Sequence, residues 1–169
     1  KKKALIFSLL ATLGLVCVGG CYFISQNQTQ AVKAEARKTF IQSSRPTIFF
    51  HGWGSSSRAE RHMANAAIDA GVTKTIIDAK VDKDGQVTLD GSIPKDAINP
   101  IVLVNFDKNR GASTQDQGDY AHAVVKALQD NYGITEMNMV GHSYGNIAIV
   151  YYMLQHGSDK TLPKLVKQV

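Results

Sequence analysis

The chain has 169 residues, of which 44% are hydrophobic and 20% charged, the average composition of a globular protein and not of a disordered one. The formal net charge is +5, but three of the 19 basic residues are the first three of the chain. The remainder carries 16 basic residues against 14 acidic ones, a net charge of +2, with no basic patch that would indicate nucleic-acid binding.

The N-terminal segment has the features of a membrane-targeting sequence. Lys1, Lys2 and Lys3 precede an uncharged stretch from Ala4 to Ile24, whose 21 residues could cross a bilayer core of about 30 Å as a helix. Because the lysines should stay cytoplasmic, we expect residues 1–24 to be a membrane anchor or lipoprotein signal and the rest to be extracellular at the cell membrane. A buried core helix is the alternative, against which the leading lysines and the terminal position argue.

Two types of anchor remain open. Residues 18–21 (Val-Gly-Gly-Cys) resemble a lipoprotein processing box, in which Cys21 would be lipidated and become the mature N-terminus. In an uncleaved signal anchor, Cys21 would instead be a small apolar residue of the membrane helix. Cys17 and Cys21 are the only cysteines, so the exported part has no disulfide and no cysteine metal site.

The polar residues 25–44 are expected to form a linker, and residues 45–169 the folded domain. The domain begins with an apolar run, Thr47–Phe50, typical of a buried strand. A helix should follow from the serines at 55–57 to about Ala70, closed by Gly71. Next, residues 75–81 and 86–89 alternate apolar and polar side chains around Asp84-Gly85, which predicts a hairpin.

The rest of the domain alternates strand and helix. Residues 101–106 form a continuous apolar run, typical of a parallel strand covered on both faces. An amphipathic helix follows at 116–132, with Tyr120, Val124, Ala127 and Leu128 on one face. A strand at 137–140, a helix at 146–156 that is apolar almost all round and should be buried against the sheet, and a strand beginning at Leu165 complete the pattern. The predicted fold is an α/β domain with a mostly parallel sheet and flanking helices.

A motif for nucleophilic catalysis lies between the last predicted long helix and the strand before it. It comprises Gly141, His142, Ser143, Tyr144 and Gly145, which spell Gly-x-Ser-x-Gly. A strand before this pattern and a helix after it are typical of a nucleophile elbow, a tight turn that exposes the serine above the sheet. Chance alone produces the pentapeptide in about one chain in twenty of this length, and a chance match with a strand before it and a helix after it is rarer still. The motif therefore indicates Ser143 as a nucleophile.

A second motif follows the first strand. His51-Gly52-Trp53-Gly54 resembles the histidine–glycine loops that form half of the oxyanion hole in α/β-hydrolases. That resemblance implies that the backbone N–H of Trp53 and that of Tyr144 are the two oxyanion donors. Alone, the motif would be an ordinary loop after a strand; the elbow downstream, in the correct order, favours the catalytic interpretation.

The chain offers no evident base for Ser143. After the serine it holds only His156 and Asp159, and His156 should lie about 20 Å away along the same helix. The His142 side chain should point away from its neighbour, and the helical residues His62 and His122 should be solvated. His51 is expected to hold the oxyanion loop. We therefore expect that the triad acid and histidine are missing, that the chain is an N-terminal part of the domain, and that this part alone is inactive.

These motifs together resemble those of a known family. With Asn105-Phe106-Asp107 and Tyr132-Gly133, they are similar to the Gram-positive cell-surface α/β-hydrolases long catalogued as a domain of unknown function. The resemblance spans Pro46 to Val169, about the first half of such a domain. Two residues depart from the family pattern: Asn146 replaces a common glycine, and Tyr144 replaces a more usual methionine, which could narrow the pocket.

The expected function is that of a serine hydrolase acting on ester-like acyl substrates, small molecules or lipids, through a Ser143 acyl-enzyme. The alternatives are an acyltransferase or thioesterase on the same scaffold and a surface binding protein without catalysis. We find no sequence signal for a cofactor or a metal: there is no His-Glu-x-x-His, cysteine cluster or phosphate-binding glycine loop.

Overall fold

The computed structural model describes residues 22–31, 35 and 39–169. The chain divides into two compact units, Lys1–Phe40 and Ile41–Val169. In the first unit, residues 22–31 are helical. No helix within the described ranges is both long and apolar enough to cross a membrane. Most of the predicted targeting segment, residues 1–21, lies outside those ranges.

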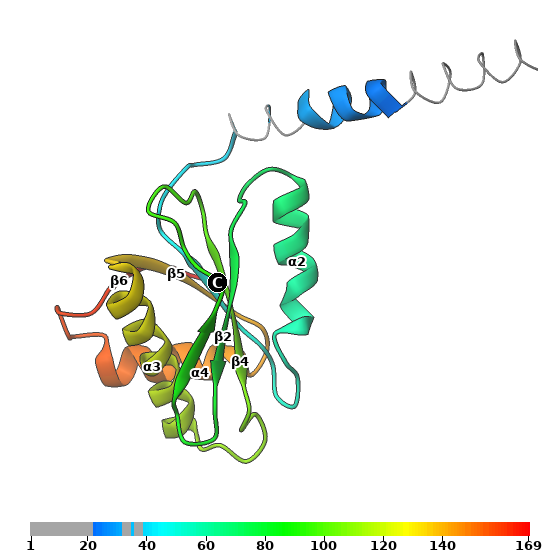
Figure 1. Cartoon of the computed structure of the whole chain (residues 1–169). Helices are drawn as coiled ribbons and strands as arrows, with labels where there is room; N and C mark the ends of the chain where they lie inside the picture. Colours follow the sequence, from blue (N-terminus) through cyan, green and yellow to red (C-terminus); the bar gives the residue numbers. More distant parts are fainter. Residues whose placement is uncertain (1–21, 32–34, 36–38) are drawn as a thin grey trace, which may run out of the picture. The chain divides into compact units, whose positions relative to one another are not determined.

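The second unit is built on a mixed sheet. Its strands, as far as the structure describes the chain, are β1 (Thr47–Phe50), β2 (Ile76–Val81), β3 (Val87–Asp90), β4 (Ile101–Phe106), β5 (Glu136–Gly141) and β6 (Lys164–Gln168). They lie in the order β3-β2-β4-β1-β5-β6 (Figure 1). Only the edge pair β2–β3 is antiparallel, and all the other pairs are parallel. The predicted fold class is therefore confirmed, and so is the hairpin around Asp84-Gly85.

Helices cover both faces of this sheet. Helix α2 (Arg58–Asp69) lies on one face, and α3 (Thr114–Tyr132) and α4 (Gly145–His156) lie together on the other (Figure 1). Along each strand, successive side chains point to opposite faces of the sheet. On β1, Ile48 and Phe50 belong to the main core with α3 and α4, whereas Phe49 packs in the smaller cluster with Ala64 of α2.

Helix α3 begins two residues before its predicted start because a capping box fixes its N-terminus. The Ser113 hydroxyl accepts a hydrogen bond from the Asp116 N–H at 3.0 Å. The Asp116 carboxylate in turn accepts one from the Ser113 N–H, also at 3.0 Å. This reciprocal pair satisfies two N–H groups that a helix start leaves without partners. Its signal, Ser113 three residues before Asp116, was present in the sequence.

Helix α4 packs against the sheet as predicted, but only one of its sides is buried, although its residues are apolar almost all round. Its buried positions are Gly145, Ala148, Ile149 and Tyr152, which occupy one side of the helix. Leu154 is 74% exposed, because two residues turn the helix by about 200° and carry its side chain away from that of Tyr152. On α3 the burial also differs in detail: Ala127 is only half-buried, although Tyr120, Val124 and Leu128 are buried as predicted.

The topology brings three loops to one edge of the sheet. Because β1, β4 and β5 are adjacent and parallel, their carboxyl ends meet at the same edge. The loop after β1 begins at His51, the loop after β4 at Asp107, and β5 leads into Ser143. Ligand sites of open α/β sheets lie at this edge.

Candidate active site

Ser143 occupies a sharp turn between β5 and α4. Its φ angle is 52°, in the left-handed region that a residue with a side chain rarely adopts. Among the described residues, only Asn99 shares a positive φ without being a glycine. The Ser143 side chain is exposed at the carboxyl edge of the sheet. A strained serine presented to solvent between a strand and a helix is the geometry of a nucleophile elbow.

The two glycines of the motif are required by close backbone contacts. A Cβ on Gly145 would lie 2.1 Å from the carbonyl oxygen of Phe50 on β1, and no side chain fits there. A Cβ on Gly141 would lie 2.7 Å from the backbone nitrogen of Asn146. The elbow thus presses α4 against β1, and glycine at both positions allows that approach.

The loop after β1 lies directly against the elbow. A Cβ on Gly52 would be 3.5 Å from the Cβ of Ser143 and 3.4 Å from the carbonyl oxygen of His142. In the described part of the chain, neither the Trp53 N–H nor the Tyr144 N–H donates to another protein group. The latter also stands at the N-terminus of α4, where the helix dipole favours negative charge. Among the described residues, these two N–H groups thus have no protein acceptor.

His51 is buried and anchors the loop after β1 to β4. Its Nε2 accepts a hydrogen bond from the Phe106 N–H at 3.1 Å, so this nitrogen carries no proton. Nδ1 therefore carries the proton and donates to the Gly52 carbonyl at 2.8 Å. Both ring nitrogens are engaged in holding the loop, and neither is available to Ser143.

We predict that Gly52→Ala separates folding from catalysis. The contacts of the new methyl group, 3.4 and 3.5 Å, are ordinary van der Waals distances, so the melting temperature should change little. The methyl group would nevertheless stand beside the nucleophile, where a substrate carbonyl has to approach. We expect the full-length protein to lose about 10²-fold in kcat/KM for an ester substrate, measured by steady-state hydrolysis. Unchanged kcat/KM would show that substrates do not approach Ser143 from the side of Gly52.

A buried carboxylate supports the elbow from α2. Glu60 is 2% exposed, and its Oε1 accepts a hydrogen bond from His142 Nδ1 at 3.0 Å. Its Oε2 is buried without a described partner. His142, whose side chain is 59% exposed, therefore turns toward α2 and links that helix to the elbow.

We predict that His142→Ala destabilises the protein by about 1–3 kcal/mol, because it leaves the buried Glu60 carboxylate without its partner. In a Glu60→Met background, where no buried charge remains, the same His142→Ala change should cost less than about 0.5 kcal/mol. Urea unfolding of the four full-length proteins of this double-mutant cycle measures both costs. Equal costs in the two backgrounds would mean that the two side chains are not coupled.

Sequence reasoning did not identify Glu60, and it noted Asn146 only as a departure from a glycine. The Asn146 amide donates to the Gly141 carbonyl at 2.8 Å and to the Ser143 carbonyl at 3.2 Å. It therefore ties the two ends of the elbow together. Asparagine directly after an elbow is a local signal that could have indicated this role, since its amide commonly bonds nearby backbone groups.

The remaining histidines lie away from Ser143. His62 is exposed on α2, as predicted. The prediction that His122 is solvated is wrong: its ring stacks on His156 at 3.8 Å between centroids. Burial and the neighbouring His156 lower the pKa of His122. This pair joins α3 to the C-terminal end of α4, whereas Ser143 precedes the other end of that helix.

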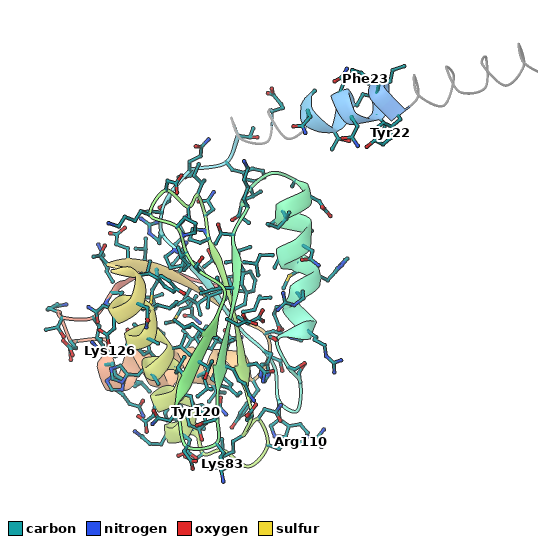
Figure 2. The ribbon with its side chains drawn as sticks, in the orientation of Figure 1. Tyr22, Phe23, Lys83, Arg110, Tyr120 and Lys126 are labelled. Atoms are coloured by element: carbon teal, nitrogen blue, oxygen red, sulfur yellow. The ribbon has the colours of Figure 1, made fainter. Side chains whose placement is uncertain are left out.

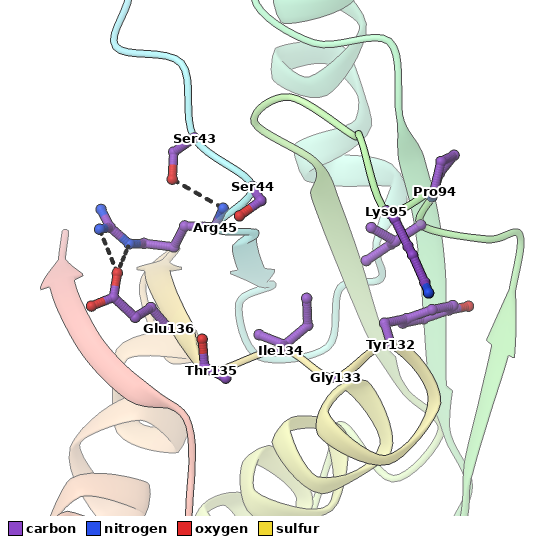
Figure 3. Close-up of a pocket in the computed structure, with 11 residues that line it drawn as sticks. Ser43, Ser44, Arg45, Pro94, Lys95, Tyr132, Gly133, Ile134, Thr135 and Glu136 are labelled. Carbon is purple, nitrogen blue, oxygen red and sulfur yellow. Dashed lines mark hydrogen bonds and ion pairs between the residues drawn. The ribbon is translucent and has the colours of Figure 1, made fainter.

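A cavity elsewhere in the second unit lies away from Ser143. It has a volume of about 330 Å³ and lies at the amino ends of β1 and β5, the edge opposite to Ser143 (Figure 3). There the Arg45 guanidinium pairs with the Glu136 carboxylate at 2.7 Å, which lowers the pKa of Glu136. No three His, Cys, Asp or Glu side chains cluster as metal ligands in the described ranges.

Comparisons with known proteins identify the family of this chain and agree with its fold. The model of the family described as "Alpha/beta hydrolase of unknown function (DUF915)" matches residues 34–169. The crystal structure of the lin2722 gene product from Listeria innocua is similar at 30% sequence identity, with a TM-score of 0.67 over 73% of this chain and 49% of that protein. A protein named "putative cell surface hydrolase" from Lactobacillus plantarum WCFS1 is 22% identical, with a TM-score of 0.59 over 73% of this chain and 50% of that one. No curated protein matches the chain significantly. The chain spans about half the length of these two solved structures.

Proposed function

Because this chain belongs to the alpha/beta hydrolase family of unknown function (DUF915), we propose that it supplies the nucleophile and the oxyanion hole of a serine hydrolase. The observation that carries the proposal is the position of Ser143. Its side chain is exposed at a positive φ, the Gly52 loop lies against it, and the N–H groups of Trp53 and Tyr144 have no described acceptor. Fold alone would not support a mechanism, since one fold hosts many functions.

The proposed reaction is acyl transfer in two steps. Ser143 Oγ attacks the ester carbonyl carbon as a general base accepts its proton, and the carbonyl oxygen becomes an oxyanion bound by the two N–H groups. The carbon–oxygen bond to the leaving alcohol then breaks, and the alcohol takes the proton. Water attacks the acyl-enzyme by the same route, which releases a carboxylic acid and restores the serine.

The base in this proposal is a histidine from the half of the fold that this chain does not span. Within the described ranges, His51 is fully engaged in hydrogen bonds and His142 bonds Glu60, so neither serves Ser143. The substrate class proposed is a carboxylic ester of a small molecule or a lipid. The cell-surface name of the Lactobacillus protein and the charge pattern of residues 1–24 support a location at the outer face of the membrane, with the N-terminus as the anchor.

Covalent labelling tests the proposal. An alkyl fluorophosphonate should react once with the full-length protein: Ser143 Oγ bonds to phosphorus as fluoride leaves, and the serine proton passes to the base. Mass spectrometry of the digested protein should find the adduct on the peptide that contains Ser143, and Ser143→Ala should abolish it. A folded protein that stays unlabelled, or that is labelled elsewhere, would contradict the proposal and favour a binding protein without catalysis.

A further inference from the structure

The loop after β4 presents a cation beside the oxyanion loop. In Figure 2, Arg110 lies at the same end of the sheet as Lys83 in the β2–β3 turn, which is the carboxyl edge. The guanidinium carbon of Arg110 stands 5.2 Å from the centre of the Trp53 ring, a cation–π contact. Trp53 is 60% exposed and Arg110 is also exposed, so both side chains are accessible to solvent.

Contacts between the loop after β1 and the loop after β4 fix the position of Arg110. Gly54 has a φ of 67°, and a Cβ there would lie 2.9 Å from Arg110 Nε, so the arginine side chain occupies the space that glycine leaves free. The Gly54 N–H donates to the Asn109 carbonyl at 3.4 Å, and the Asn109 amide donates to the Ser55 carbonyl. These contacts fix the residue next to Arg110 against the oxyanion loop.

The other charged side chains of this loop are neutralised. Asp107 pairs with Lys80 at 3.1 Å, and Lys108 pairs with Asp116 at 3.2 Å. Across the described ranges, no carboxylate lies within ion-pair distance of Arg110, so its charge has no counter-ion among these residues. An arginine with five directed donors and no counter-ion is suited to bind carboxylate or phosphate oxygens.

The loop that holds Arg110 also lies next to Ser143. A Cβ on Gly52 would lie 3.5 Å from the Cβ of Ser143, and Gly54, on which Arg110 packs, is two residues further along the chain. Two trans peptide units span at most about 7.6 Å between Cα atoms. A short acyl chain or leaving group would bridge this separation, with its apolar atoms along the exposed Trp53 ring.

We propose that Arg110, held on Trp53 and Gly54, selects substrates that carry an anionic group near the scissile ester. This inference rests on the proposed serine hydrolase function and names its substrate class. The recognised chemistry is a carboxylate or phosphate, on either the acyl or the leaving-group side. Arg110 is thus a specificity residue, and the reacting atoms remain those of Ser143 and the oxyanion hole.

The test compares matched neutral and anionic esters with the full-length protein. The acyl arm pairs 4-nitrophenyl octanoate with the mono-4-nitrophenyl ester of octanedioic acid. The leaving-group arm replaces 4-nitrophenol by 3-carboxy-4-nitrophenol, and a third arm compares a monoacylglycerol with its 3-phosphate. The readout is the ratio of kcat/KM for the anionic ester to that for the neutral ester, and the arm with the highest ratio identifies the location and type of the anion.

Arg110→Gln should lower this ratio about tenfold in at least one arm, as expected for the loss of one charge-assisted hydrogen bond. Arg110→Glu should lower it further, and Arg110→Lys should retain part of it. Lys108→Gln is the matched control: it removes the same charge from the same loop, but Lys108 pairs with Asp116 and is not held on Trp53 and Gly54, so it should not contact the substrate anion and the ratio should stay constant.

The outcomes separate this inference from the proposed function. If Ser143→Ala abolishes turnover but Arg110→Gln leaves the ratio unchanged in all arms, the Arg110 inference is wrong and the hydrolase proposal stands. An equal fall of the ratio with Lys108→Gln would also overturn the Arg110 inference, because the fall would then reflect the overall charge of the loop and not a contact made by Arg110. If Ser143→Ala retains turnover, the proposed function itself fails.

Discussion

Full-length protein with Ser143→Ala is expected to lose ester hydrolysis by at least about 10³-fold in kcat, because no acyl-enzyme can form without the serine oxygen. The remaining activity would come from the oxyanion hole, which the substitution leaves in place since both donors are backbone groups. Initial rates with a chromogenic ester at saturating and limiting concentrations measure the loss. KM should change little, because the carbonyl still binds the N–H groups of Trp53 and Tyr144.

Stability provides the control for this prediction. Ser143→Ala keeps a side chain at a φ of 52°, so the free energy of unfolding should match that of the wild-type protein. Ser143→Gly removes the Cβ from this left-handed position and should stabilise the protein by about 1 kcal/mol while also abolishing turnover. A Ser143→Gly protein that is less stable than Ser143→Ala would show that the turn is not strained.

Most of the fold could be predicted from local pattern. The strands Thr47–Phe50 and Ile101–Phe106 coincide with uninterrupted apolar runs, since each is covered on both faces. The hairpin followed from alternation around Asp84-Gly85. Which side of α4 is buried could not be predicted in this way, because composition does not say which elements pack around a helix. Leu154 is as apolar as Ile149, yet only the latter faces the sheet.

The parts of the candidate site differ in the same way. The elbow could be predicted because its glycines and serine lie within five consecutive residues and each meets a local requirement of the backbone. The roles of Glu60 and Arg110 could not be predicted because their partners are distant in sequence. Glu60 bonds His142, 82 positions away, and Arg110 packs on Trp53 from another loop. Such contacts depend on the parallel order of β1, β4 and β5, which brings three loops to one edge.

Gly145→Ala is expected to prevent stable folding of the second unit. The new methyl carbon would lie 2.1 Å from the Phe50 carbonyl oxygen and 3.0 Å from that of His51. Both neighbours are backbone atoms of β1 and its loop, so no side-chain rotation relieves the clash. Either α4 moves away from the sheet or β1 shifts in register, and each change exposes part of the main core, including Ile48 and Ala148.

We expect this substitution to cost about 3 kcal/mol or more, the upper range for overpacking, which is a large part of the stability of an ordinary domain. Urea unfolding and soluble yield of the full-length protein measure it. Gly111→Ala is the matched control: its φ of 75° imposes the strain of a left-handed residue, but its Cβ would meet no atom within 4 Å. It should therefore cost only about 1 kcal/mol. Similar losses for the two variants would mean that the close contact between α4 and β1 costs no more than ordinary left-handed strain, and that this contact does not require the second glycine of the elbow.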